Sequence, residues 1–450
     1  DTALRIQAAK RFSGRGAGNP VADDNIIHGH LQFNIKRNSG PGQYFGKKTA
    51  MALANRASAM IKQGGMRILK DPNLPILLAV VMFAVTGGSL VGPILPEMLS
   101  LSGATSKNIG LAMSSYTFCA LVATPLLGPV ADRFGRKSVI VPSVLLFGVG
   151  GLLITFTRSF WLLLLWRAFQ GIGVGGMMNT VVAAIGDMYR EPERTRAMGF
   201  RVTVQGLTNA TVPFVSGAIA TMAWFLPFYI HSLAILLAIL AAFKLEEPAK
   251  SEKTEKYMAR ALRALVDLRA IWLFFSNFMG FVLLYGIVVY MPILVVEAFE
   301  LTTLHSGLAI SVGAGVSAMT ASQSGRLSGK FSEEARVFFG FAGCGLSLLL
   351  MGLAGSYPLL LSFMSVWGLG FGTLMPTLNT AAAGLVSTEL RAGVLSVFTL
   401  LIYLGQTVSP PFFALFVRDS LVRSAFFAGS ATALLPLLFT LYIRVRKRHL

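Results

Sequence analysis

The sequence predicts an all-α integral membrane protein in which twelve transmembrane helices form two pseudo-symmetric six-helix bundles. Hydrophobic residues make up 54% of the chain and charged residues only 13%, about half the charged share of a soluble domain. The apolar residues fall in blocks of about 20, which is the length that a helix needs to cross a bilayer. Several features also recur at an offset of 197 residues, which indicates a duplicated unit.

Each apolar block is expected to be helical, because hydrocarbon offers the backbone no hydrogen-bond partner and a helix satisfies its own amides. Short polar loops separate the blocks and define where each helix ends. The twelve expected spans are 74–97, 108–130, 138–157, 160–185, 198–220, 224–243, 271–296, 304–325, 337–355, 357–385, 393–417 and 424–443.

Polar segments divide the chain into a tail, two bundles, a linker and a second tail. The first 70 residues carry twelve basic and three acidic residues, and they begin at Asp1 rather than Met, so we interpret the chain as processed or incomplete. Both a flexible tail and a surface or partner-binding helix fit this composition. The expected regions are 1–73 (basic tail, with an amphipathic helix at 47–70), 74–244 (N-terminal bundle), 245–270 (linker with a surface helix), 271–444 (C-terminal bundle) and 445–450 (basic tail).

The net charge of +19 reflects membrane topology and not binding to nucleic acid. Loops after even-numbered spans, together with the C-terminal tail, hold 20 Lys and Arg when Lys244 is counted with span 6, whereas loops after odd-numbered spans hold four. This bias follows the positive-inside rule and predicts that both termini lie on the cytosol-like side. The basic, acid-poor N-terminal tail is typical of organelle-targeted proteins and favours a plastid or mitochondrial membrane over the plasma membrane.

The internal repeat places small residues and prolines at matching positions of the two bundles. Spans 4 and 10 each contain a Gly-x-Gly-x-Gly run, and spans 5 and 11 share a proline. Glycines inside a membrane span allow helix backbones to approach closely. The residues expected at helix-packing positions are Gly171, Gly173, Gly175, Pro213, Gly217, Gly368, Gly370, Gly372 and Pro410.

The loop between spans 2 and 3 combines glycines with charged residues, which suits a gate. The first glycine lets two helices approach, the second permits a tight turn, and the aspartate can cap a helix or pair across the bundle interface. A purely topological basic loop would explain the basic residues but not the glycine spacing. The expected gating residues are Gly128, Asp132, Arg133, Gly135, Arg136 and Lys137.

This loop closely resembles the signature loop of the major facilitator superfamily. Arg167-x-x-Gln170-Gly171 in span 4 looks like the second motif of that family. The sequence around Pro213 resembles, in weakened form, the antiporter motif Gly-Pro-x-x-Gly-Gly, with Val212 and Ser216 at two of its glycine positions. The resemblance covers residues 74–444 and points to the twelve-helix, drug:proton antiporter-like group. It implies a carrier that works by alternating access.

Few charged residues lie deep in the spans. Arg167 lies about seven residues into span 4, and an intramembrane cation is by default functional. No Asp or Glu is expected near mid-bilayer, which leaves His231 as the remaining titratable group there. We interpret Arg167 and His231 as candidates for coupling or anion contact. A structural role, with Arg167 on helix carbonyls and His231 bonded to a neighbouring helix, remains the alternative.

Polar and aromatic residues in the central spans are candidates to line a substrate cavity. Each of them fits an interhelical hydrogen bond equally well. The candidates are Gln170, Asn179, Gln205, Asn277, Tyr285, Trp367, Asn379 and Gln406.

The leading function is a secondary active or facilitative transporter of a small organic solute, with the resemblance favouring efflux. The alternative is a structural or accessory subunit of a larger membrane complex, as the absence of mid-membrane carboxylates and the long basic tail suggest. An enzyme is not expected, because no nucleophile–base set and no metal-ligand spacing occurs. We expect no cofactor or metal. The expected partners are membrane lipid, a small-molecule substrate and a protein that binds residues 1–70.

Overall fold

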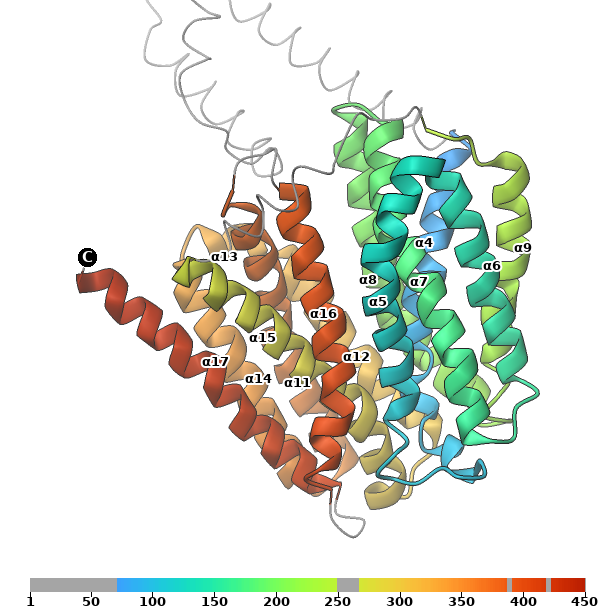
Figure 1. The fold of residues 1–450 in the computed structure, drawn as a ribbon. Helices are drawn as coiled ribbons and strands as arrows, with labels where there is room; N and C mark the ends of the chain where they lie inside the picture. Colours follow the sequence, from blue (N-terminus) through green and yellow to red (C-terminus); the bar gives the residue numbers. More distant parts are fainter. Residues whose placement is uncertain (1–70, 249–266, 387–390, 418–421, 450) are drawn as a thin grey trace, which may run out of the picture. The chain divides into compact units, whose positions relative to one another are not determined.

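A computed structural model describes most of the two bundles (Figure 1). All described residues belong to one compact unit, which spans 65–450. The expected tail helix at 47–70 and the expected surface helix of the linker lie outside the described residues. The described ranges are 71–248, 267–386, 391–417 and 422–449.

Six helices form the N-terminal bundle, close to their expected positions. The first expected span, 74–97, is interrupted: helix α4 ends at Ser89 and short 3₁₀ turns follow at Gly92–Ile94 and Glu97–Ser100. Pro93 and Pro96 lie in this stretch and lack the amide hydrogen that a continuous helix needs. The helices are α4 (Asn73–Ser89), α5 (Leu111–Phe134), α6 (Arg136–Ile154), α7 (Phe160–Met188), α8 (Glu193–Ala220) and α9 (Phe228–Lys244).

Six long helices form the C-terminal bundle, and a short helix, α13 (Ser324–Ser328), was not expected from the sequence. The last helix continues to His449 and includes most of the expected basic tail at 445–450, since no proline or glycine interrupts these residues. The long helices are α11 (Leu268–Phe299), α12 (Thr303–Ser322), α14 (Glu333–Leu353), α15 (Tyr357–Ala383), α16 (Arg391–Ala414) and α17 (Arg423–His449).

Twelve long helices thus occupy the twelve expected spans, and the described residues contain no β-strand. Ten of these helices are long and apolar enough to cross a membrane by length and composition alone. Helix α9 is only 17 residues long, and α8 begins with a polar turn that contains Arg194 and Arg196. Both helices belong to the N-terminal bundle, whose other helices are long and apolar enough to span a membrane. The architecture is therefore that of a multi-pass membrane protein.

The repeated glycines lie where helices cross. A Cβ atom on Gly171 or Gly175 would collide with the backbone of α5, whereas one on Gly173 would collide with the backbone of α6. In the second bundle, Gly368 and Gly372 lie against α12, and Gly370 lies against α14. Helices α7 and α15 are therefore each held between two neighbours by alternating glycines, in the same way in both bundles.

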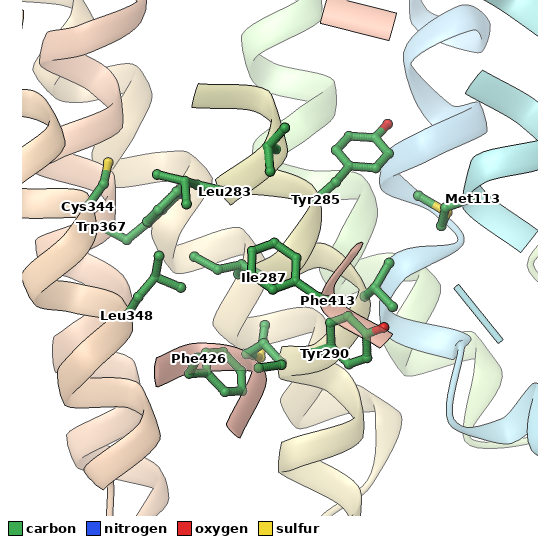
Figure 2. Packing of buried hydrophobic residues seen from close by; sticks show 14 of the residues in the cluster. Met113, Leu283, Tyr285, Ile287, Tyr290, Cys344, Leu348, Trp367, Phe413 and Phe426 are labelled. Atoms are coloured by element: carbon green, nitrogen blue, oxygen red, sulfur yellow. The ribbon is translucent and has the colours of Figure 1, made fainter. Parts of the chain in front are cut away.

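Helix α11 forms the centre of the C-terminal bundle and is buried along most of its length. Two of its polar side chains bond to neighbouring helices: Trp272 donates to the hydroxyl of Thr440 at 2.9 Å, and Tyr290 donates to the carbonyl of Pro410 at 2.9 Å. Around it pack apolar side chains from α14 to α17, among them Leu348 and Phe413 (Figure 2). This packing fixes the side of α11 that faces the N-terminal bundle.

The two bundles are joined by neutral hydrogen bonds between α5 and α16 and between α8 and α12. The hydroxyl of Ser114 donates to the carbonyl of Thr407 at 2.9 Å, and the hydroxyl of Thr407 donates to that of Thr117 at 2.9 Å. On the other pair of helices, Thr303 donates to the carbonyl of Gly217 at 3.0 Å. We call this set of contacts the closed end.

At the opposite end of the bundles, which carries the charged loops, no hydrogen bond between the bundles occurs among the described residues. Ser114 lies in the first turn of α5 and Gly128 lies near its other end, so the two are about 20 Å apart along the helix. No atom lies within 4 Å of a Cβ placed on Gly128 or Gly325. We call this the open end. Its glycines Gly128 and Gly325 have no neighbouring atom at the Cβ position, whereas a Cβ on Gly217 at the closed end would collide with the carbonyl of Thr303.

Candidate functional site

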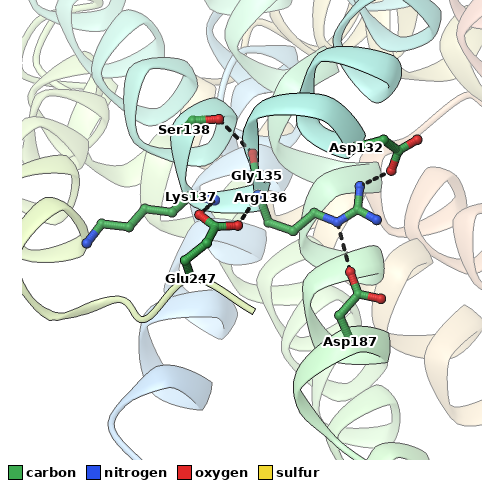
Figure 3. Close-up of polar contacts among 7 residues, drawn as sticks. All are labelled: Asp132, Gly135, Arg136, Lys137, Ser138, Asp187 and Glu247. Carbon is green, nitrogen blue, oxygen red and sulfur yellow. Dashed lines mark hydrogen bonds and ion pairs between the residues drawn. The ribbon is translucent and has the colours of Figure 1, made fainter. Parts of the chain in front are cut away.

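At the open end, Arg136 bridges two carboxylates of the N-terminal bundle (Figure 3). Its Nη1 is paired with Asp132 one turn earlier, and its Nε lies 2.9 Å from Oδ2 of Asp187 at the end of α7. The side chains of Arg136 and Asp187 are 15% and 16% exposed, whereas that of Asp132 is 40% exposed. Asp132 is therefore the accessible member of the cluster.

Glu247 caps the first turn of α6. Its carboxylate accepts hydrogen bonds from the backbone amides of Arg136 and Lys137, the latter at 2.9 Å. An anion at a helix N-terminus satisfies free amides and complements the helix dipole. Since Glu247 follows α9, this contact ties the end of the first bundle to the loop between α5 and α6 (Figure 3).

Gly135 makes the sharp turn between α5 and α6 possible. Its φ is 106°, a conformation that side chains disfavour, and a Cβ there would lie 2.6 Å from the carboxylate of Glu247. Only glycine combines this turn with the Glu247 cap.

Replacing Gly135 with Ala is expected to destabilise the protein by about 1–3 kcal/mol, because it adds backbone strain and displaces Glu247. Thermal unfolding of the purified protein in detergent measures the effect as a lower Tm. Gly128→Ala is the matched control, because nothing lies within 4 Å of that Cβ. Equal melting temperatures for the two variants would contradict this account of the turn.

A second polar cluster fixes the same end of the N-terminal bundle. Tyr189, just after α7, donates to Oδ2 of Asp71 at 2.6 Å, and the side chain of Asn73 bonds to both Asp71 and Glu246. Burial and the hydrogen bond to Asp71 raise the pKa of Tyr189, so it remains a protonated donor. The starts and ends of α4, α7 and α9 are thereby held together.

The expectation that Asp132 pairs across the bundle interface is not met in this conformation, in which Asp132 pairs with Arg136 of its own bundle. Arg133 lies over the ring of its neighbour Phe134, with 5.3 Å from its Cζ to the ring centroid. The charged loop therefore makes its ion pairs and hydrogen bonds within the N-terminal bundle, as far as the described part of the chain is concerned.

Arg167 is fully buried inside the N-terminal bundle. Its Nε donates to the carbonyl of Ala112 at 3.0 Å, its Nη1 donates to Oε1 of Gln170 at 2.9 Å, and its guanidinium lies 4.2 Å from the ring centroid of Tyr116. Of the described residues, no carboxylate contacts it. The guanidinium is thus a charge held by carbonyl oxygens and an aromatic face.

Gln170 connects Arg167 to His231. The amide nitrogen of Gln170 lies 2.9 Å from Nδ1 of His231, which is itself fully buried between Phe147 and Phe228. These residues link α7 to α9 within the N-terminal bundle.

The remaining cavity candidates divide into buried residues and residues that are at least partly exposed. Asn277 donates to the carbonyl of Phe398 at 2.9 Å, and Trp367 stacks on Phe371 inside the C-terminal bundle. Tyr285 lies at the interface of the bundles and is 7% exposed. The other candidates are partly or fully exposed: Asn179, Gln205, Asn379 and Gln406.

Two kinds of residue at these sites were not identified as functional candidates. Glu247 belongs to a short acidic stretch after span 6, and its role as a helix cap depends on a contact over 110 residues of sequence. Tyr116 and Tyr403 lie in spans without any motif. The signal that could have identified them is the presence of a tyrosine hydroxyl inside a span, because such a group usually needs a hydrogen-bond partner.

The chain belongs to the Major Facilitator Superfamily, whose family model matches residues 77–410. It is therefore a multi-pass membrane transporter of small solutes that works by alternating access, and not an enzyme. The helical architecture is that of this class.

Relatives include exporters of bacteria. The bacillibactin exporter of Bacillus subtilis (strain 168) is 24% identical over 391 residues, which are 82% of this chain and 96% of the relative. The quinolone resistance protein NorA of Staphylococcus aureus is 27% identical over 166 residues, or 37% of this chain and 43% of that protein.

A solved structure with the same fold is a bacterial homologue of the human lysosomal transporter Spinster in an inward-facing, unoccupied conformation. Its TM-score is 0.69 at 17% identity, with 84% of this chain and 95% of that one covered. A mutant of the nucleoside transporter NupG has a TM-score of 0.68 at 15% identity, over 82% and 98% of the two chains.

Proposed function

We propose that this chain exports a small amphipathic organic solute, and that the loop around Asp132 is the gate of the open end. The observation that carries this proposal is the asymmetry of the bundle contacts. Hydrogen bonds across the bundles lie at the closed end, whereas the charged cluster of Asp132 and Arg136 lies at the end where the bundles are apart. Alternating access requires that these two ends exchange roles.

The export direction rests on the relatives, whose names describe an exporter and a resistance protein. Ser216, at a glycine position of the antiporter-like motif, donates to the carbonyl of Leu90 at 2.6 Å and so joins α8 to the end of α4. Among the described residues, no carboxylate lies in the middle of a span, which argues against ordinary proton antiport through a buried acid. Arg167 and His231 remain the candidates for coupling.

Accumulation of a panel of amphipathic compounds tests the export direction. Cells that lack their main exporters and express this chain are expected to retain several-fold less of at least one compound than cells with an empty vector, as measured by mass spectrometry. Cells that express the Asp132→Asn variant control for the burden of expression. Higher retention, or equal retention of every compound, contradicts export.

The orientation and the membrane form part of the same proposal. The excess of Lys and Arg in the loops of the open end supports both termini on the cytosol-like side. The composition of residues 1–70 supports a plastid or mitochondrial membrane and a protein partner for this tail. Protease access to a C-terminal tag in sealed organelles tests the orientation of the C-terminus. Deletion of residues 1–45, with native gels as the readout, tests whether the tail binds a protein partner.

A further inference from the structure

Two tyrosines, one from each bundle, meet at consecutive glycines of α4. A Cβ on Gly87 would collide with the hydroxyl of Tyr116 from α5, and a Cβ on Gly88 would lie 3.1 Å from the hydroxyl of Tyr285 from α11. Figure 2 shows the hydroxyl of Tyr285 turned away from the C-terminal core, toward α4. The glycine pair therefore makes room for phenol groups of both bundles.

A third tyrosine completes the cluster. Tyr403 belongs to α16, yet it packs with the apolar core of the N-terminal bundle and is 8% exposed. Tyr116 belongs to the same cluster of buried residues. Thr407, one turn further along α16, makes the hydrogen bonds of the closed end. The cluster thus lies directly beside the contacts that close the pathway.

The three hydroxyls differ in their hydrogen bonds. Tyr116 donates to the carbonyl of Ala84 at 3.0 Å. The hydroxyls of Tyr285 and Tyr403 have no hydrogen-bond partner among the residues that the structure describes. Nearly buried tyrosine hydroxyls usually have a partner, so two donors at the bundle interface remain available to a ligand.

The charge near this cluster is positive. Arg167 lies over the ring of Tyr116, and the hydroxyls of Tyr116 and Tyr285 lie at the adjacent glycines Gly87 and Gly88. In the described spans no carboxylate lies at this depth to balance the guanidinium. Charge interactions are strong where water is largely excluded, so an anion beside the tyrosines would be stabilised.

We propose that Tyr285 and Tyr403 donate hydrogen bonds to the carboxylate of an aromatic solute, and that Arg167 favours this anion without touching it. The inference rests on the proposed export function and names its substrate class. The aromatic rings of the tyrosines supply the apolar contact for the ring of the solute. The neutral amide of the same solute lacks the charge and binds less tightly.

Binding of naphthylacetate and of its neutral amide, naphthylacetamide, to the purified full chain tests the proposal. Isothermal calorimetry is expected to show the acid bound at least about fivefold more tightly than the amide. In Tyr285→Phe and Tyr403→Phe this preference should fall to about twofold or less, because each loses a hydrogen bond to a charged acceptor, while the affinity for the amide changes little.

Two control variants separate the binding site from general effects of losing a hydroxyl. Tyr290→Phe removes a hydroxyl that is committed to the carbonyl of Pro410, and Tyr229→Phe removes one on a residue that is 43% exposed. Both are expected to keep the preference for the acid. Melting temperatures of all four variants show whether each one is folded.

Equal affinities for acid and amide, binding of neither probe, or a preference that survives in Tyr285→Phe and Tyr403→Phe would overturn the inference. The export proposal fails separately. If the acid is preferred but no compound of the panel is exported, the tyrosine site stands and export is wrong. If compounds are exported without any preference for acids, only the tyrosine site is wrong.

Discussion

Replacing Asp132 with Asn is expected to lower the initial rate of solute export at least about tenfold, which corresponds to about 1.4 kcal/mol or more. Asp132 is the exposed carboxylate of the open-end cluster, and its exposed side would meet the opposite bundle when that end closes. The amide keeps the shape of the side chain but loses the charge. Arg136 retains Asp187 as a partner, so the fold should persist.

Initial rates in vesicles, together with the Tm in detergent, measure both parts of this prediction. Glu191→Gln is the matched control, because it also removes one carboxylate from an exposed position near this end, where Glu191 bonds only to Thr195 in the described structure. The control should transport at the wild-type rate. An Asp132→Asn variant with unchanged flux would remove Asp132 from the gate.

Replacing Gly217 with Leu is expected to prevent the closed end from forming and to abolish transport. A side chain at this position would collide with the carbonyl of Thr303 and would lie against Gly307, both of which belong to the other bundle. Since the clash lies between the bundles and not within one, each bundle should still fold. The protein would then be held in the conformation in which this end is apart.

Spin-label distances measure this shift without any substrate. After Cys119 and Cys344 are replaced by Ser, labels at Lys107 and Leu415 report on the closed end. Their distance should increase in Gly217→Leu. Gly206→Leu on the same helix is the control, because nothing lies within 4 Å of its Cβ and the present conformation accommodates it. An unchanged distance in Gly217→Leu is the outcome that refutes the assignment.

The sequence predicts the architecture well because the physical signals for it are local. Each span must satisfy its own backbone in hydrocarbon, so apolar blocks mark helices without reference to the rest of the chain. The helix ends differ from the expected bounds where a local signal is weak. Prolines after Gly92 end the first helix early, and the basic residues of the expected C-terminal tail continue helix α17 to His449.

Contacts between distant residues were beyond the reach of sequence reasoning. The pairing of Arg136 with Asp187 and the Glu247 cap each depend on how the bundle folds. The hydrogen bond between Gln170 and His231 likewise joins helices that are not adjacent in sequence. Polar residues in the spans were recognised as candidates, but their directions follow from helix rotation, which composition does not specify.

The hydrogen bonds at the closed end have a consequence for energetics. They are neutral contacts such as those of Ser114 and Thr303, and each contributes about 0.5–1.5 kcal/mol. A solute bound with micromolar affinity releases about 8 kcal/mol. Only the part of this free energy that differs between the two conformations shifts their populations, and a difference of about 5.5 kcal/mol, which outweighs several such bonds, reverses a ratio of about 1:99. Contacts this weak keep the two conformations close in free energy, so that the bound solute determines to which side of the membrane the transport pathway opens.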